Sequence, residues 1–140
     1  MLCWCTGPYG LCRYVVFNLA TNKWHVLPRS FCSVGQAHLG FDPTSSHFHV
    51  IEFIEVEGAC VGVEIYSSKT AIWIFKKSEW GDGSIVLHSK SRSVFLNGFM
   101  HMLEYSVIVV VDMEGKTWRT ICKPCGAEMS IHQAQGHLYV

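Results

Sequence analysis

Short segments in which apolar and polar side chains alternate run through most of the chain, and this alternation constrains the fold most. Five of them are rich in β-branched and aromatic residues, as strands on a pleated surface are. They cover residues 13–18, 48–56, 61–66, 93–96 and 107–112. No window of a dozen residues carries the apolar spacing of an amphipathic helix. The sequence therefore predicts an all-β protein built from antiparallel sheets.

Turn signals separate the predicted strands. Asn97-Gly98 lies between two apolar triplets and predicts a two-residue hairpin, since both residues tolerate a positive φ. Further turn signals are Gly7-Pro8, Asp42-Pro43, Gly81-Asp82-Gly83 and Glu114-Gly115. Many short strands joined in this way are typical of a sandwich, a barrel or a propeller.

One layout, a strand followed by a polar turn, a tryptophan and a second strand, occurs three times. Trp24, Trp73 and Trp118 recur at intervals of 49 and 45 residues, and a period of about 40 to 50 residues suits propeller blades. We expect each tryptophan to bury its ring against a neighbouring blade. The alternative is chance repetition in an aromatic-rich β protein. The expected repeat positions are Asn18, Trp24, Tyr66, Trp73, Asn97, Gly98, Asp112, Trp118 and Gly136.

The first hairpin, Asn18-Leu-Ala-Thr-Asn-Lys-Trp24-His-Val-Leu-Pro28, resembles the Asn-Pro-x-Thr-x-x-Trp-x-x-Leu-Pro hairpin of plant F-box proteins. In those proteins the hairpin belongs to the F-box-associated, kelch-like β-propeller that follows the F-box. The resemblance extends from about residue 11 to residue 140. Later pieces are similar to further elements of that domain in the same order: Leu39-Gly-Phe-Asp-Pro43, Ser46-His-Phe-His-Val50, Val63-Glu-Ile-Tyr-Ser-Ser68, Ser93-Val-Phe-Leu-Asn-Gly98, residues 111–121 and Gln135-Gly-His-Leu-Tyr-Val140.

The resemblance implies a non-catalytic protein–protein interaction module without a cofactor. In such proteins the F-box binds the adaptor of a cullin-type (SCF) ubiquitin ligase, and the propeller selects the protein to be ubiquitinated. We therefore expect an unidentified protein substrate or partner. This chain departs from the family in three ways. First, we find no F-box in these residues, so we expect no direct binding to the ligase adaptor. Second, Leu19 replaces the usual proline of the first hairpin. Third, Cys122-Lys-Pro-Cys125 stands where a proline-rich segment typically follows the strand.

The length of 140 residues suits one domain. At one unit per 45 to 49 residues it holds about three blades, whereas propellers usually close with about four to eight. We therefore expect residues 1–140 to form a partial F-box-associated propeller domain. A truncated, non-functional relative of the family is an alternative.

Charge and hydropathy exclude two classes of partner. Lys plus Arg and Asp plus Glu both number 11, so the basic surface of a nucleic-acid-binding protein is not expected. The longest aliphatic run, residues 107–111, is far short of the roughly 20 residues of a membrane-spanning helix.

We find no secretory signal, and the seven cysteines are an odd number. We expect an intracellular protein, in the cytoplasm or nucleus, with reduced thiols.

Cys122 and Cys125 form the one tight pair of metal-ligand type. Together with His132 and His137 they could form a zinc site, because thiolates and imidazoles are the ligands that zinc prefers. The six residues between Cys125 and His132 are fewer than the roughly twelve of a classical zinc finger. For this reason we expect these cysteines to be ordinary buried thiols. An intracellular zinc or thiol-redox protein that uses Cys122 and Cys125 is a second alternative.

Two other pairs of polar residues do not indicate a metal site or a catalytic site. His47 and His49 are predicted to share a strand face, as are Glu55 and Glu57, and both pairs are expected on a solvated surface. No local signature singles out a nucleophile, a phosphate-binding loop or a catalytic dyad. In a binding module the contacts would come from loops. The candidate segments are residues 29–36, 80–84 and 123–130.

Overall fold

A computed structural model of the chain describes residues 2–6, 13–31, 37–57, 59–78, 91–105, 107–123 and 129–140. Within these ranges the backbone forms thirteen strands and no helix, which confirms the all-β prediction. All strand pairs are antiparallel. The predicted turns at Gly7-Pro8 and Gly81-Asp82-Gly83 lie outside the described residues.

The strands form four sheets, and each sheet is a meander of consecutive strands. Sheet A contains β1 (Leu2–Thr6), β2 (Arg13–Asn18) and β3 (Lys23–Val26). Sheet B contains β4 (Ala37–Asp42), β5 (His47–Val56), β6 (Ala59–Ser67) and β7 (Ile72–Lys77). Sheet C contains β8 (Arg92–Leu96), β9 (Phe99–Leu103), β10 (Val107–Asp112) and β11 (Trp118–Cys122). Sheet D contains β12 (His132–Ala134) and β13 (His137–Tyr139), and none of the four described sheets closes on itself.

Two hairpins use the same two-residue turn. Asn97 and Gly98 have φ values of 51° and 82°, and they join Leu96 to its partner Phe99. Gln135-Gly136 repeats the arrangement between β12 and β13, with φ values of 51° and 75°. Positive φ at both positions defines the type I′ turn, whose twist matches that of paired strands. The hairpin predicted at Asn97-Gly98 is confirmed.

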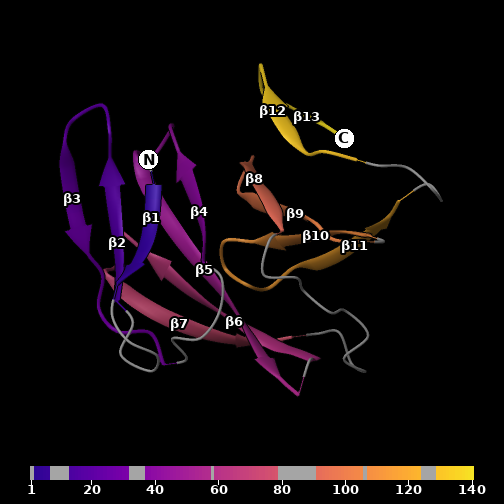
Figure 1. The fold of residues 1–140 in the computed structure, drawn as a ribbon, viewed down its shortest axis with the longest axis horizontal. Helices are drawn as coiled ribbons and strands as arrows, with labels where there is room; N and C mark the ends of the chain where they lie inside the picture. Colours follow the sequence, from indigo (N-terminus) through magenta and orange to yellow (C-terminus); the bar gives the residue numbers. More distant parts are fainter. Residues whose placement is uncertain are drawn as a thin grey trace.

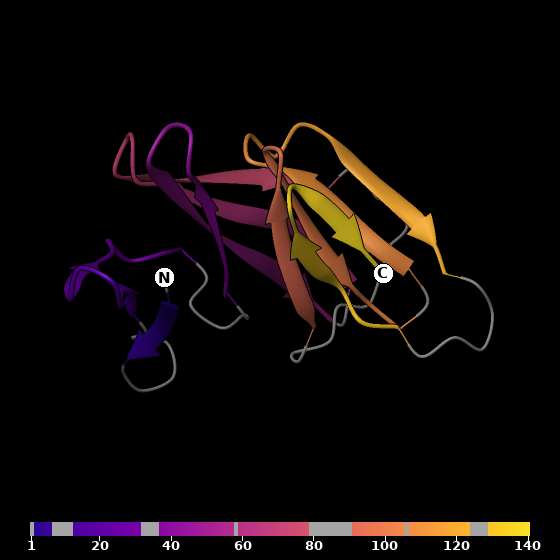
Figure 2. The same cartoon turned by 90° about the horizontal axis from the view of Figure 1, so that it is seen from above.

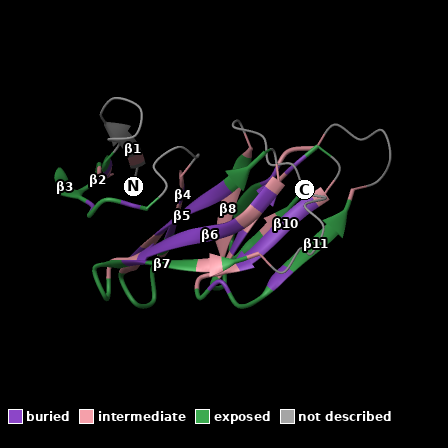
Figure 3. Ribbon diagram, turned by 90° about the horizontal axis from the view of Figure 1, so that it is seen from below, coloured by how far each residue is buried: buried purple, intermediate pink, exposed green. Residues whose placement is uncertain are grey.

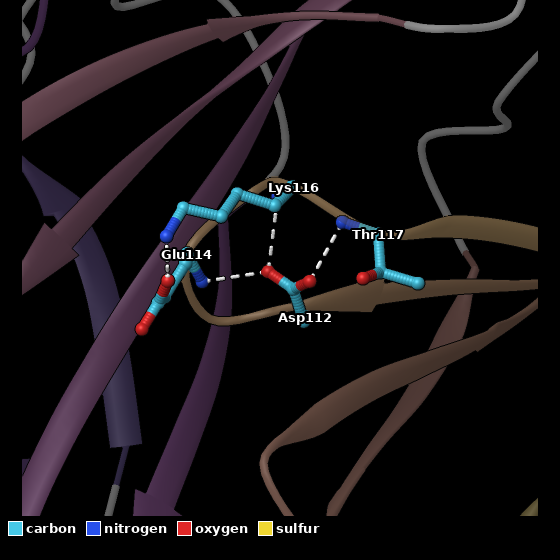
Figure 4. A network of polar contacts seen from close by, with 4 residues as sticks. All are labelled: Asp112, Glu114, Lys116 and Thr117. Atoms are coloured by element: carbon cyan, nitrogen blue, oxygen red, sulfur yellow. Dashed lines mark hydrogen bonds and ion pairs between the residues drawn. The ribbon is translucent and has the colours of Figure 1, made fainter.

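A longer turn closes the last hairpin of sheets A, B and C. The strand before each turn ends in Asn18, Ser67 or Asp112, whose side-chain oxygen accepts the backbone N–H two residues further on. At Asp112 the carboxylate also accepts the backbone N–H groups of Lys116 at 3.0 Å and Thr117 at 2.6 Å (Figure 4). Such side-chain bonds replace backbone partners that a reversing chain lacks. A tryptophan follows six residues after each of the three polar residues.

The sheets stack face to face in chain order. One apolar cluster joins sheets A and B, a second joins B and C, and a third joins C and D. Sheets B and C are therefore covered on both faces, and purple, buried residues run along β5, β6 and β10 in Figure 3. For this reason residues 50–54 of β5 are all buried, and the predicted alternation stops there.

The first strand of each sheet contacts the first strand of the next, from β1 to β4, β8 and β12. In Figure 1, β4 and β8 lie near the middle of the molecule, and β3, β7 and β11 lie toward its outside. A hydrogen bond of 2.9 Å joins His38 Nδ1 of β4 to Ser93 Oγ of β8. The described residues thus form four sheets and not about three units. The tryptophan count misses sheet D, which has no such hairpin.

The three hairpin tryptophans occupy one register position but differ in burial. They pair with Phe17, Tyr66 and Val111 on the preceding strand of their own sheets. Trp73 and Trp118 are each 9% exposed, as expected, and pack against the preceding sheet. Trp24 is 63% exposed, so the prediction that it is buried is wrong. No described sheet precedes sheet A to cover it.

Candidate functional site

The two edges of the sheet stack carry different connections. The β4–β5, β6–β7, β8–β9 and β10–β11 turns lie along the upper edge in Figure 2. The connections between β5 and β6 and between β9 and β10 lie along the lower edge. We call this lower edge the loop edge. By their place in the sequence, the three candidate binding segments lie between the last strand of one sheet and the first strand of the next. Only Arg29–Phe31, Lys123, Met129 and Ser130 of these segments lie within the described residues.

Two aromatic side chains stand out on these connections. Phe31, between β3 and β4, is 84% exposed, and Tyr105, between β9 and β10, is 87% exposed. They are the most exposed large hydrophobic side chains among the described residues. Aromatic side chains held in water on loops are frequent anchors of protein interfaces. The predicted segment 29–36 contains Phe31, but no sequence signal distinguished Tyr105 from a core tyrosine.

The backbone around Phe31 is fixed to the sheets beneath it. The Phe31 N–H donates to both carboxylate oxygens of Glu64, at 3.1 and 3.0 Å. The N–H of the buried Leu27 donates to the Tyr14 carbonyl at 2.8 Å, and Trp73 Nε1 donates to the Pro28 carbonyl at 2.8 Å. The segment therefore holds the Phe31 ring in solvent from a rigid base.

Glu64 belongs to a buried pair of acids that no sequence motif indicated. Glu52 of β5 and Glu64 of β6 are direct cross-strand partners, and both are fully buried. Burial, the charge of Glu52 and a hydrogen bond to Glu52 raise the pKa of the Tyr14 hydroxyl. Burial and then Glu52 raise the pKa of the Cys3 thiol to about 11. Both groups therefore stay protonated at neutral pH.

This polar cluster links two sheets, and its two glutamates and Tyr14 are buried, whereas Cys3 is half-buried. Tyr14 and Cys3 come from sheet A, and the two glutamates come from sheet B. Buried polar groups are retained where they are hydrogen-bonded, and here the bonds cross from one sheet to the next. Because both carboxylates are enclosed, the pair is suited to positioning the chain and not to proton transfer with a substrate.

Tyr105 is also held through its neighbours. The Glu104 N–H donates to the Val107 carbonyl at 2.9 Å, which closes the turn. The buried Glu104 carboxylate accepts the Ser91 hydroxyl at 2.5 Å, and Lys123 Nζ donates to the Tyr105 carbonyl at 3.1 Å. These bonds tie the turn to the start of β8 and to the end of β11.

The candidate zinc ligands lie on two sheets. Cys122 ends β11 and is exposed, so the expectation that it is a buried thiol is wrong. His132 and His137 are exposed on the hairpin of sheet D. The two histidines share one hairpin face, since His137 pairs with Ala134, two residues after His132. Cys125 lies outside the described residues. Within the part of the chain that the structure describes, no group of three His, Cys, Asp or Glu residues is placed to hold a metal ion.

The remaining polar pairs behave differently from each other. His47 and His49 lie two residues apart on β5 and share a face, as predicted, but both are half-buried and not on the solvated surface that was expected. Burial, followed by the neighbouring His47, lowers the pKa of His49. Glu55 and Glu57 are both exposed, but Glu57 lies beyond β5 in a turn with a φ of 52°. The prediction that the two acids share a strand face is therefore wrong.

A scan against protein-family models found no family that matches this chain, and a search of curated proteins found no matching relative. Among the described residues, no helix is long and apolar enough to cross a membrane. The function is therefore inferred from the geometry and chemistry of the chain itself.

Proposed function

We propose that the chain is a non-catalytic protein-binding module built as part of a β-propeller. The observation that carries the proposal is the repeated stacking of antiparallel meanders whose first strands are neighbours along the stack. Radial repetition of four-stranded meanders around a shared centre defines a propeller. The common register of Trp24, Trp73 and Trp118 supports the same interpretation.

The sequence resemblance supports a particular kind of propeller. The residues that resemble the F-box-associated hairpin, 18–28, contain the β2–β3 turn, strand β3 and the Pro28 carbonyl that accepts the Trp73 Nε1 hydrogen bond. The role that this resemblance suggests is selection of a protein for a cullin-type ubiquitin ligase. The chain would supply the surface that selects this protein, without contact to the ligase adaptor.

We place the binding surface at the loop edge, with Phe31 and Tyr105 as anchors. A backbone segment already held in position loses little conformational freedom when the side chains that it carries bind a partner. The partner is therefore expected to be a folded protein with apolar pockets for one or both rings. Central aromatic anchors each contribute about 2 kcal/mol or more at protein interfaces.

Comparative affinity purification from plant cell extract tests this surface. The immobilised wild-type chain is compared with the Phe31→Ala/Tyr105→Ala double variant and with Leu19→Ala. Leu19 is a matched control because it is 64% exposed and lies in the β2–β3 turn. We expect specific proteins to be retained by wild type and Leu19→Ala and depleted at least tenfold by the double variant. Equal recovery on all three chains, or no specific protein on wild type, would contradict the proposal.

A further inference from the structure

Strand β7 is the outer edge of sheet B, and within the described residues one side of its backbone pairs with no strand. The Ser78 N–H, just beyond β7, donates to the Val61 carbonyl of β6 at 2.8 Å. Hydrogen-bonded and non-hydrogen-bonded pairs alternate along an antiparallel ladder. The N–H and C=O groups of Trp73, Phe75 and Lys77 therefore point away from β6.

This edge lacks the features that usually protect an edge strand. Proteins commonly blunt an exposed edge with a proline, a β-bulge, a very short strand or a charged residue within it. β7 pairs with β6 over six consecutive residues, and it contains no proline. Its first four residues are apolar, and its two lysines lie at the end of the strand. An edge of this kind is a template for pairing with another extended segment.

Exposed apolar side chains flank this edge on both faces of β7. Ile72 and Ile74 share the face that is turned toward sheet C, and Phe75 is on the opposite face. All three are about half exposed. A Cβ atom built on Gly62 would lie 2.7 Å from Cε2 of Phe75, so the ring rests on the backbone of β6. The other outer strands, β3 and β11, are shorter and carry fewer exposed apolar side chains.

Two lysines give this edge a positively charged end. Lys76 and Lys77 are consecutive, so they project from opposite faces of β7. Within the described ranges neither lysine forms a hydrogen bond or an ion pair through its side chain. A Cβ atom built on Gly115 would lie 2.6 Å from Cγ of Lys76, so the β10–β11 turn packs against the stem of that side chain. Carboxylates on an incoming strand would find an unpaired ammonium group on each face.

We infer that β7 binds an extended segment of a partner protein, which adds a fifth strand to sheet B. The segment carries apolar side chains beside the exposed apolar residues of β7 and Asp or Glu opposite Lys76 and Lys77. A second copy of β7 is a poorer match, because β7 contains no acidic residue to pair with the lysines. The inference rests on the edge of sheet B alone, so it does not depend on the binding surface proposed at the loop edge.

Selection from a displayed library of random peptides, each long enough to span the six residues of β7, tests this edge. We expect wild type to enrich peptides that combine β-branched and acidic residues. The enriched peptide is then titrated against Phe75→Pro and Phe75→Thr by fluorescence anisotropy. Both variants lose the ring, but only proline removes the outward N–H, and an edge strand tolerates proline there. We expect Phe75→Pro to bind about tenfold or more weakly than Phe75→Thr. No enrichment on wild type, or equal binding to the two variants, would overturn the inference.

A charge swap tests the position of the acidic residues and does not depend on how well the proline variant folds. Lys76→Glu/Lys77→Glu is expected to weaken binding of the enriched peptide about tenfold or more. A peptide with lysine in place of its acidic residues is expected to restore binding to this variant. Lys69→Glu, in the exposed β6–β7 turn, is the control and should bind the original peptide like wild type. Unchanged binding after the reversal, or no restoration by the swapped peptide, would overturn the inference.

Two further measurements separate this inference from other occupants of the edge and from the proposed function. If light scattering shows a wild-type dimer that Phe75→Pro does not form, the occupant is a second copy and the inference is overturned. Phe31→Ala/Tyr105→Ala is expected to bind the enriched peptide like wild type, and loss of binding would place the peptide at the loop edge instead. Failure to recover proteins from extract, with peptide binding intact, would overturn only the proposed function.

Discussion

Burial of the repeated tryptophan depends on the sheet that precedes it and not on the local hairpin. Trp24, Trp73 and Trp118 follow similar turns and occupy the same register. Only Trp73 and Trp118 have a sheet to pack on, and Trp73 also donates to the Pro28 carbonyl. The same residue type therefore has two different energetic roles within one chain.

We predict that Trp73→Ala lowers the free energy of unfolding by about 3–5 kcal/mol, because it removes a buried ring and leaves a cavity. Trp24→Ala, made at the equivalent exposed position, is expected to change it by less than about 0.5 kcal/mol in dilute solution. Equilibrium urea unfolding measures both values. Equal losses for the two variants would show that Trp24 is buried in the monomer.

Glu64 acts on the loop edge through a backbone bond. We predict that Glu64→Ala raises amide hydrogen exchange at Phe31 by about one to two orders of magnitude, since leaving a part-buried N–H without its acceptor costs about 1–3 kcal/mol. Exchange measured by mass spectrometry on the peptide containing residues 27–31 reports the change. Glu57→Ala, at an exposed turn, is the control and is expected to leave this peptide unchanged.

At the scale of elements, the strands β4 and β8 form the close contact between sheets B and C. A Cβ atom built on Gly40 would lie 2.7 Å from Cδ2 of Phe95, which is closer than van der Waals contact allows. His38 and Ser93 add their hydrogen bond to the same contact. The absence of a side chain at Gly40 therefore sets how closely the two first strands approach.

We predict that Gly40→Ala lowers the free energy of unfolding by about 1–3 kcal/mol, the usual cost of overpacking a filled interior. In a Phe95→Ala background the same substitution is expected to cost less than half as much, because the Cγ and Cδ2 atoms that the new Cβ would meet are gone. A double-mutant cycle from urea unfolding measures this coupling. Additive losses would contradict the proposed clash.

The alternation placed five of the thirteen strands of the described residues closely, and it did not indicate how the sheets contact one another. The limits of β2, β8 and β10 agree closely with the alternation of Arg13–Asn18, residues 93–96 and residues 107–112, since local pleating and turn chemistry determine them. Glu52 and Glu64 were missed because charged residues within a strand normally indicate a solvated face. Their burial depends on sheet A, which is remote in sequence.

At the scale of the whole molecule, each sheet contacts the sheets next to it in the chain, so stability depends on the contacts between sheets. Histidines lie at or near these contacts. Burial lowers the pKa of His38 to about 4, and it also lowers the pKa values of His49 and His101. The unfolded chain therefore binds more protons than the folded chain between about pH 6.5 and pH 4.

This difference predicts that the free energy of unfolding is highest above pH 6.5 and falls as the pH decreases toward 4. The shift of His38 from 6.5 to about 4 corresponds to a loss on the order of 3 kcal/mol. His38→Gln removes the proton-binding group and can still bond Ser93, so we expect it to flatten the profile by about 2–3 kcal/mol at pH 4.5. Urea unfolding of dilute protein at a series of pH values, with the exposed His132→Gln as control, measures the difference. If the free energy of unfolding of His38→Gln falls with decreasing pH as steeply as that of wild type, another group causes the loss of stability in acid.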